Sequence, residues 1–143
     1  MLSSEVITRL KAAVAGLRTV EGALELAALL RAKGLPQQGV GAFVVPMGER
    51  GGAVQDFTGM HVQSLTETVG VILIWRVADA ARDRDAAAVD DLRLDVMGAL
   101  AGWQPAGAAN VLRFSRGAPL TVAPGSFAYT LEFALDHQLR IPA

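Results

Sequence analysis

The segment from His61 to Ala78 constrains the fold most strongly, because it has the pattern of one long and largely buried β-strand. Ile72 and Ile74 make its second face apolar as well, which predicts that the second half is central in a sheet and covered on both sides. A strand of about eighteen residues exceeds the usual three to ten, so we expect its first half to project as an arm. Gly70 predicts a bulge or bend midway. The residues of the first apolar face are Leu65, Val69, Val71, Leu73, Trp75 and Val77.

Three segments predict helices. The first begins at a Ser3 or Ser4 cap and ends near Gly16, with apolar residues at three- and four-residue steps. The second, from Ala23 to Lys33, is short and rich in strong helix formers, and Gly34 and Pro36 stop it. The third, from Ala86 to Gly102, has one apolar face and one face of charged residues.

Five further segments predict strands. Leu17 to Val20 has the character of a short edge strand, and Gly39 to Val45 is a β-branched run ended by Pro46. Val111 to Phe114 and Leu120 to Val122 are short candidates joined by a turn at Ser115 to Pro119, and Phe127 to Leu139 alternates as a half-buried antiparallel strand. The order of elements predicts one α+β domain over residues 1–143. We expect a mixed, mainly antiparallel sheet of about four to five strands, packed against two main helices and one short helix.

The stretch from Met47 to Met60 contains four glycines and has no clear period. We expect a loop of about fourteen residues, which is longer than most connections inside compact domains and typical of functional or mobile segments. Its apolar residues Val54, Phe57 and Met60 are unusual for a fully solvated loop. A contact surface would explain them.

Composition points to a protein that hides part of its surface. Charged residues make up 19% of the chain and hydrophobic residues 52%, so a lone monomer would be short of surface charge. Multimerisation explains this shortage, although the abundance of alanine is an alternative explanation. A net charge of -1 with scattered basic residues argues against stable DNA binding. The absence of cysteine excludes disulfides and thiolate sites.

The sequence shows no signature of a targeting segment or of a catalytic site. The start lacks a signal-peptide pattern, and the run from Val69 to Trp75 is too short to span a bilayer, so we expect a cytosol-like compartment or a particle assembled there. His61 and His137 stand alone, and the glycine-rich stretches complete no phosphate-binding fingerprint. We therefore expect no enzyme activity, catalytic residue, cofactor or metal. The acidic residues Asp90, Asp91 and Asp95 are best explained as a solvated helix face.

The order and spacing of several short motifs resemble the tail terminator proteins of long-tailed bacteriophages, particularly those of Mu-like and related phages. The resemblance covers nearly the whole chain, and its weight lies in the order of the motifs. They are the helix with Leu26 to Leu29, the strand ending Phe43 to Pro46, Gly48 to Arg50, Val62-Gln63 with Thr66-Glu67 before Val71 to Leu73, Gly102 to Pro105, and Tyr129 to Phe133.

The resemblance implies a structural protein that forms a hexameric ring on the last ring of the tail tube protein. Such a ring ends tube growth at the head-proximal end of the virion tail and offers the surface that joins the head-completion or connector protein. DNA would pass through the ring without specific binding, and the ring would assemble in the host cytoplasm without a membrane. Candidate contacts with another subunit or with the tube are Glu49, Arg50, Phe57, Met60 and His61.

Two other classes of protein fit the same residues. One is another head–tail connector or tail-completion protein with a similar small fold. The other is a small oligomeric ligand-binding or regulatory α+β domain, which a preformed apolar pocket with convergent polar groups would favour. A flat sheet edge and an open loop would favour assembly instead.

Overall fold

The computed structural model describes residues 2–32, 39–76, 82–120 and 125–142, with side chains in the third range described from residue 87. Within these ranges, three helices accompany one five-stranded sheet with the strand order β1-β2-β3-β5-β4. The elements are α1 (Leu2–Ala13), β1 (Thr19–Gly22), α2 (Ala23–Arg31), β2 (Val40–Val54), β3 (Met60–Arg76), α3 (Arg82–Leu100), β4 (Arg113–Leu120) and β5 (Ser126–Pro142).

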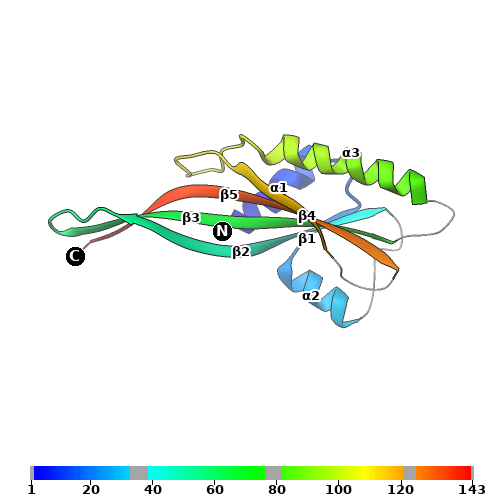
Figure 1. The fold of residues 1–143 in the computed structure, drawn as a ribbon, viewed down its shortest axis with the longest axis horizontal. Helices are drawn as coiled ribbons and strands as arrows, with labels where there is room; N and C mark the ends of the chain where they lie inside the picture. Colours follow the sequence, from blue (N-terminus) through cyan, green and yellow to red (C-terminus); the bar gives the residue numbers. More distant parts are fainter. Residues whose placement is uncertain (1, 33–38, 77–81, 121–124, 143) are drawn as a thin grey trace.

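The sheet is mixed but mainly antiparallel. The short edge strand β1 runs parallel to β2, while the pairs β2–β3, β3–β5 and β4–β5 are all antiparallel. Helices α1 and α3 form a second layer, and the shorter α2 lies on the opposite side of the sheet (Figure 1). The predicted α+β class, with two main helices and one short helix, is confirmed.

The main core lies between the sheet and the layer of α1 and α3. Val6 and Leu10 from α1 meet Val96 and Leu100 from α3 over the apolar face of β3 and β5, and all four are fully buried. A smaller cluster on the other face joins Leu26 and Leu29 of α2 to the sheet residues Phe43, Ile72, Ile74 and Ala128. The second half of β3 is therefore covered on both faces, as its double apolar pattern predicts.

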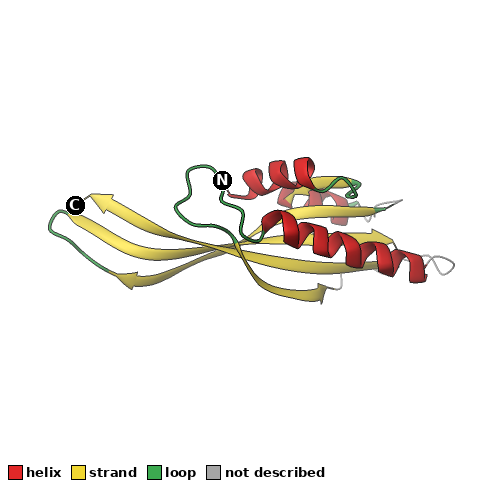
Figure 2. Cartoon of the chain, turned by 90° about the horizontal axis from the view of Figure 1, so that it is seen from above, coloured by secondary structure: helices red, strands yellow, loops and turns green. Residues whose placement is uncertain are grey.

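Three strands continue far beyond this core. Residues 40–44 of β2 are buried, whereas residues 46–54 of the same strand are exposed. Strands β2, β3 and β5 run on together past the ends of the helices, and the chain ends near the tip of this extension (Figures 1 and 2). We call residues 46–68 and 135–142 the arm. The projection expected from the length of β3 is confirmed, and β3 itself spans 17 residues.

The prediction of a loop from Met47 to Met60 is wrong. Strand β2 continues to Val54, and only residues 55–59 connect it to β3. Register shifts between Pro46 and Gly48 and between Gly51 and Val54 insert extra residues into β2. Because each shift breaks the two-residue alternation, the segment has no period in the sequence although it is a strand.

Two other strand predictions are corrected. Residues 113–114 of the first candidate and residue 120 of the second lie in one strand, β4, and the expected turn at Ser115 to Pro119 lies inside it. Proline is tolerated here because β4 is an edge strand. Gly117 suits its position because an added Cβ atom would lie only 3.0 Å from Cε1 of Tyr129. Gly70 marks no bulge between β3 and β5, whose register is continuous. Four residues at or near the predicted ends of elements lie outside the described residues, namely Lys33, Val77, Ala78 and Val122.

Candidate assembly interface

The arm ends in a tight turn that brings β2 back as β3. The backbone N–H of Phe57 donates to the carbonyl of Met60 at 3.0 Å, and the N–H of Met60 donates to the carbonyl of Phe57 at 2.9 Å. Gly59 has a φ of 83°, a left-handed conformation that favours glycine. Beside the turn, Asp56 Oδ1 lies 2.7 Å from His61 Nδ1. These contacts give the tip a defined shape.

Apolar side chains gather at this tip without cover. Phe57 is 63% exposed and Ile141 48% exposed, and Val54 and Leu139 occupy positions on either side of Gln63 in the sheet. Exposed apolar surface of this kind is typical of protein–protein contact sites. We call this set the apolar tip, and it consists of Val54, Phe57, Met60, Leu139 and Ile141.

The base of the arm is fastened to the body on one face by a polar cluster around Asp136. The Thr66 hydroxyl donates to Asp136 Oδ1 at 2.7 Å, and Arg113 forms an ion pair with the same carboxylate. The Asn110 side chain donates to the Asp136 carbonyl at 2.7 Å. The hydrogen bond from Thr66, together with Arg113, holds the pKa of Asp136 below its ordinary value, although desolvation opposes this.

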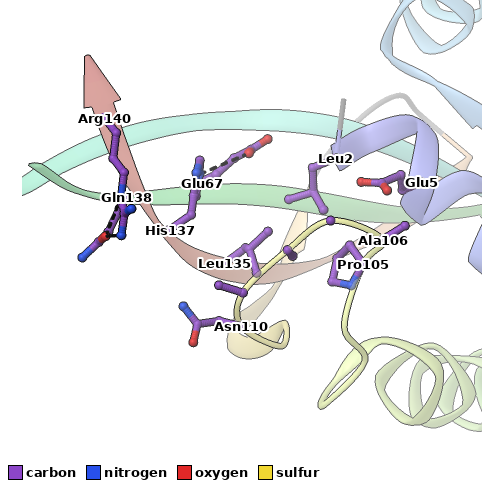
Figure 3. A pocket seen from close by; sticks show the side chains of 13 residues that line it. Leu2, Glu5, Glu67, Pro105, Ala106, Asn110, Leu135, His137, Gln138 and Arg140 are labelled. Carbon is purple, nitrogen blue, oxygen red and sulfur yellow. Dashed lines mark hydrogen bonds and ion pairs between the residues drawn. The ribbon is translucent and has the colours of Figure 1, made fainter. Parts of the chain in front are cut away.

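On the other face, a groove of about 640 Å³ lies where the arm meets α1 and residues 105–110. Figure 3 shows Leu2 and Glu5 of α1 on one side of the groove and His137 of β5 on the other. His137 Nε2 lies 3.6 Å from Glu67 Oε1 and has no hydrogen-bond partner among the described residues. The structure places His137 half-buried beside this carboxylate.

The five predicted contact residues all lie on the arm but at two levels. Glu49 and Arg50 pair with Glu67 and Thr66 at its base, on adjacent positions of β2 that face opposite sides of the sheet. Phe57, Met60 and His61 are at the tip. The first pair and the last three therefore cannot form one compact patch within a single chain.

Sequence reasoning missed the part of the surface that β5 contributes. Leu139 and Ile141 pair with Gln63 and His61, which places them beside the turn. The signal was present, because the alternation Leu135, His137, Leu139, Ile141 continues the pattern of β5 to the end of the chain. The pairing of β5 with the first half of β3 could not be read from that alternation alone.

The described residues contain no group of three or more His, Cys, Asp or Glu side chains placed to hold a metal ion. No helix among the described residues combines the length and the apolar character needed to cross a membrane. The features that the structure does offer are an arm, an apolar tip and uncovered sheet edges. Features of this kind are typical of proteins that assemble with other chains through their surfaces and the backbone edges of their sheets.

Comparison with known proteins agrees with this class. A family model described as "Phage tail terminator protein" matches residues 2–143, which is nearly the whole chain. The chain therefore belongs to the phage tail terminator family. It is a structural protein of phage tails and a component of the virion.

Solved structures support the fold. A chain of the structure titled "Virion of native gene transfer agent (GTA) particle" is 20% identical, with a TM-score of 0.54 and coverage of 96% of this chain and 95% of that one. A second solved chain covers both chains completely, but at 15% identity its TM-score is 0.37, so it carries no argument. No protein with a curated description matches the chain.

Proposed function

We propose that this protein caps the phage tail tube as a hexameric ring, stops tube polymerisation and presents the surface that the head-completion or connector protein binds. The observation that carries the proposal is the arm, in a chain that belongs to the tail terminator family. A three-stranded projection with an uncovered apolar tip is costly for a monomer, because it leaves apolar surface and backbone groups in water. Contact with other chains would remove this cost.

The proposed activity is geometric and needs no catalytic group, so we treat the protein as a non-enzyme. A head-to-tail contact between identical subunits closes into a ring when the rotation between neighbours divides the circle. One face of such a ring would match the tube protein and the other would not, so the tube would stop growing. The ring would sit at the head-proximal end of the tail, and residues 1–143 would act as one domain.

The near-neutral charge of the chain fits a ring through which DNA passes. Affinity for DNA depends mainly on the number of basic side chains that neutralise phosphates. With 13 Lys and Arg against 14 Asp and Glu, the chain offers no general excess of positive charge. A weakly interacting lumen would let the genome pass without being held.

The arm also favours assembly over a small ligand-binding domain. A ligand site is normally a largely apolar pocket with convergent polar groups that buries most of its ligand. The groove at the arm base instead exposes Glu5, Asn110 and Arg140 along an irregular loop of alanine and glycine. The largest uncovered apolar side chain of the arm, Phe57, lies at the tip and not in this groove.

Tube growth in the presence of the protein tests this function. The cognate tail tube protein is polymerised alone and with increasing amounts of this protein, and tube lengths are measured by electron microscopy. The proposal predicts shorter tubes and a ring of density on one end only. Tubes of unchanged length with bare ends would contradict it. Binding to isolated heads without any effect on tubes would instead identify a head-completion protein.

A further inference from the structure

The arm has two sheet edges without a described partner strand. Strand β1 pairs only with residues Gly41 to Val44 of β2, so the outer edge of β2 is open from residue 45 to residue 54. Strand β4 pairs with β5 only from Ala128 to Ala134, and the Asn110 side chain occupies the carbonyl of Asp136, so the outer edge of β5 is open from residue 137 to residue 142. The two open edges lie on opposite sides of the same three-stranded arm.

Backbone groups of alternate residues point toward each edge of an antiparallel strand. The carbonyl of Val40 accepts a hydrogen bond from the Arg18 N–H on the outer side of β2, and Val40 pairs with an odd-numbered residue of β3. Glu49 pairs with Glu67, which is also an odd-numbered residue of β3. The backbone of Glu49 therefore has the same orientation as that of Val40 and directs its N–H and C=O outward. It offers both groups to an additional strand.

The backbone N–H and C=O groups of β5 that point outward follow from the contact of Asp136. The carbonyl of Asp136 accepts from the Asn110 side chain, on the side away from β3. Gln138 and Arg140, two and four residues further, therefore direct their backbone groups to that side as well. Exposed apolar side chains flank both edges, with Met47 and Val54 on β2 and Leu139 and Ile141 on β5. Open edges flanked by apolar side chains are sites at which a strand from another chain adds to a sheet.

The direction of the strands selects a second copy of this chain as the partner. Strands β2 and β5 are both antiparallel to β3, so both run from the body toward the tip. When the arms of two copies point the same way, the open edge of β2 on one meets the open edge of β5 on the next in parallel. The outer edge of β2 already pairs in parallel with β1 inside the body.

We infer that neighbouring subunits join by parallel pairing within β2 residues 45–54 and β5 residues 137–142 of the next copy, so that the arms form one continuous sheet. The inference rests on the proposed ring and specifies its subunit contact. The two edges differ, so the contact is heterologous and repeats from copy to copy until the ring closes. A two-fold dimer would pair like edges instead.

Cysteine cross-linking tests this contact cleanly, because the chain contains no cysteine. Val54→Cys is combined in turn with His137→Cys, Leu139→Cys and Ile141→Cys, which share a face of β5 and sample three registers. Within one chain, β3 separates residue 54 from these positions by two strand spacings, about 10 Å, which is too far for a disulfide. Disulfides can therefore form only between copies.

The expected result is a ladder of oxidised species up to the closed ring, in at least one of the three pairs. Val54→Cys alone and Val54→Cys with Arg116→Cys, on the edge of β4, are the controls and should give no ladder. The mass of the assembly is measured in parallel. If the protein forms a ring but none of the three pairs gives a ladder, this contact is overturned while the proposed ring stands. Dimers from Val54→Cys alone would indicate pairing of like edges and would also overturn this contact. A protein that forms no ring, with or without tubes, would overturn the proposed function and the contact together.

A second pair of variants separates backbone pairing from side-chain contact. Glu49→Pro removes an outward N–H without touching the hydrogen bonds to β3, while Glu49→Ala keeps this donor and removes only the carboxylate. Loss of one hydrogen bond in each contact should weaken subunit association about fivefold or more in Glu49→Pro. Glu49→Ala keeps the backbone donor and should therefore assemble more strongly than Glu49→Pro. Equal assembly by the two variants, measured by light scattering across a dilution series, would contradict edge pairing.

Discussion

Glu67 and His137 face each other across β3 and β5 at the point where the arm leaves the helices. The carboxylate oxygen Oε1 lies 3.6 Å from Nε2 of the imidazole, which is beyond hydrogen-bond distance. His137 follows Leu135 on the same face of β5, where the buried core gives way to the groove beside α1. The pair therefore marks the boundary between the part of the sheet that the helices cover and the part that they leave open.

Replacement of His137 by Leu should change stability little. Nε2 of His137 has no hydrogen-bond partner among the described residues, and its pairing with Glu67 at 3.6 Å is partly exposed and weak. Leucine extends the apolar row from Leu135 to Leu139, so the free energy of unfolding should shift by less than about 1 kcal/mol. Leu135→Ala, two residues earlier and buried, is the matched control and should cost about 2–5 kcal/mol. Urea unfolding followed by circular dichroism measures both. Equal losses in the two variants would show that His137 is part of the core.

Two phenylalanines should separate folding from assembly. Phe133 is fully buried and contacts Phe114 edge-to-face at 5.7 Å between ring centroids, so Phe133→Ala should cost about 3–5 kcal/mol of stability. Phe57 is exposed at the tip, so Phe57→Ala should leave stability within about 0.5 kcal/mol. It should nevertheless reduce ring formation or tube capping. A Phe57→Ala variant that caps tubes as well as the unmodified protein would remove the apolar tip from the proposed interface.

The turn at the tip should depend on a residue that tolerates positive φ. Gly59→Val places a β-branched residue at a φ of 83°, which costs about 1–2 kcal/mol locally, while Gly59→Asn adopts this conformation more readily. The valine variant should be cut faster by protease at the tip and should assemble less well than the asparagine variant. The core lies far from the turn, so thermal unfolding of the body should be the same in both. A lower melting temperature for the valine variant alone would contradict this separation.

Stability should fall at low pH partly through Asp136. Its pKa is lowered in the folded state from an ordinary value of 3.8 by the Thr66 hydroxyl and Arg113. The stabilisation is therefore complete above pH 3.8 and is lost as the pH falls through the lower folded value. Because the carboxylate is half exposed, the contribution is below about 1 kcal/mol. Comparison of urea unfolding at pH 7 and pH 2.5 should show a smaller loss for Asp136→Asn than for the unmodified chain, and an identical loss would contradict the assignment.

Periodicity in the sequence was sufficient where one strand keeps one alternation. The apolar face from Leu65 to Trp75 and the double cover of Ile72 and Ile74 follow directly from residue spacing, and so does the excess length that predicts an arm. The first and third helices were predicted for the same reason, since their apolar faces repeat at three and four residues, whereas the second was predicted from its strong helix formers and its glycine and proline stop signals. Sequence reasoning therefore identified the class of fold and the presence of a projection.

Pairings between distant segments were not readable in this way. The extension of β2 through Gly48 and Gly51 depends on the β3 partner, which holds a glycine-rich chain in a strand despite two register shifts. The strand through Gly117 and Pro119 depends similarly on Tyr129 and on the edge position of β4. Local propensity favours turns at both places, and the neighbouring strands override it. The proposed contact surface was predicted as a loop for this reason, although it is a three-stranded ribbon with defined edges.

The mass of the purified protein in solution, measured by light scattering with and without its tail tube protein, tests the central claim most directly. One chain has a mass of 15.0 kDa, and the account predicts a species six times heavier, either in solution or bound to tube ends. A protein that stays monomeric or dimeric at every concentration, and that ignores tube ends, would contradict the account.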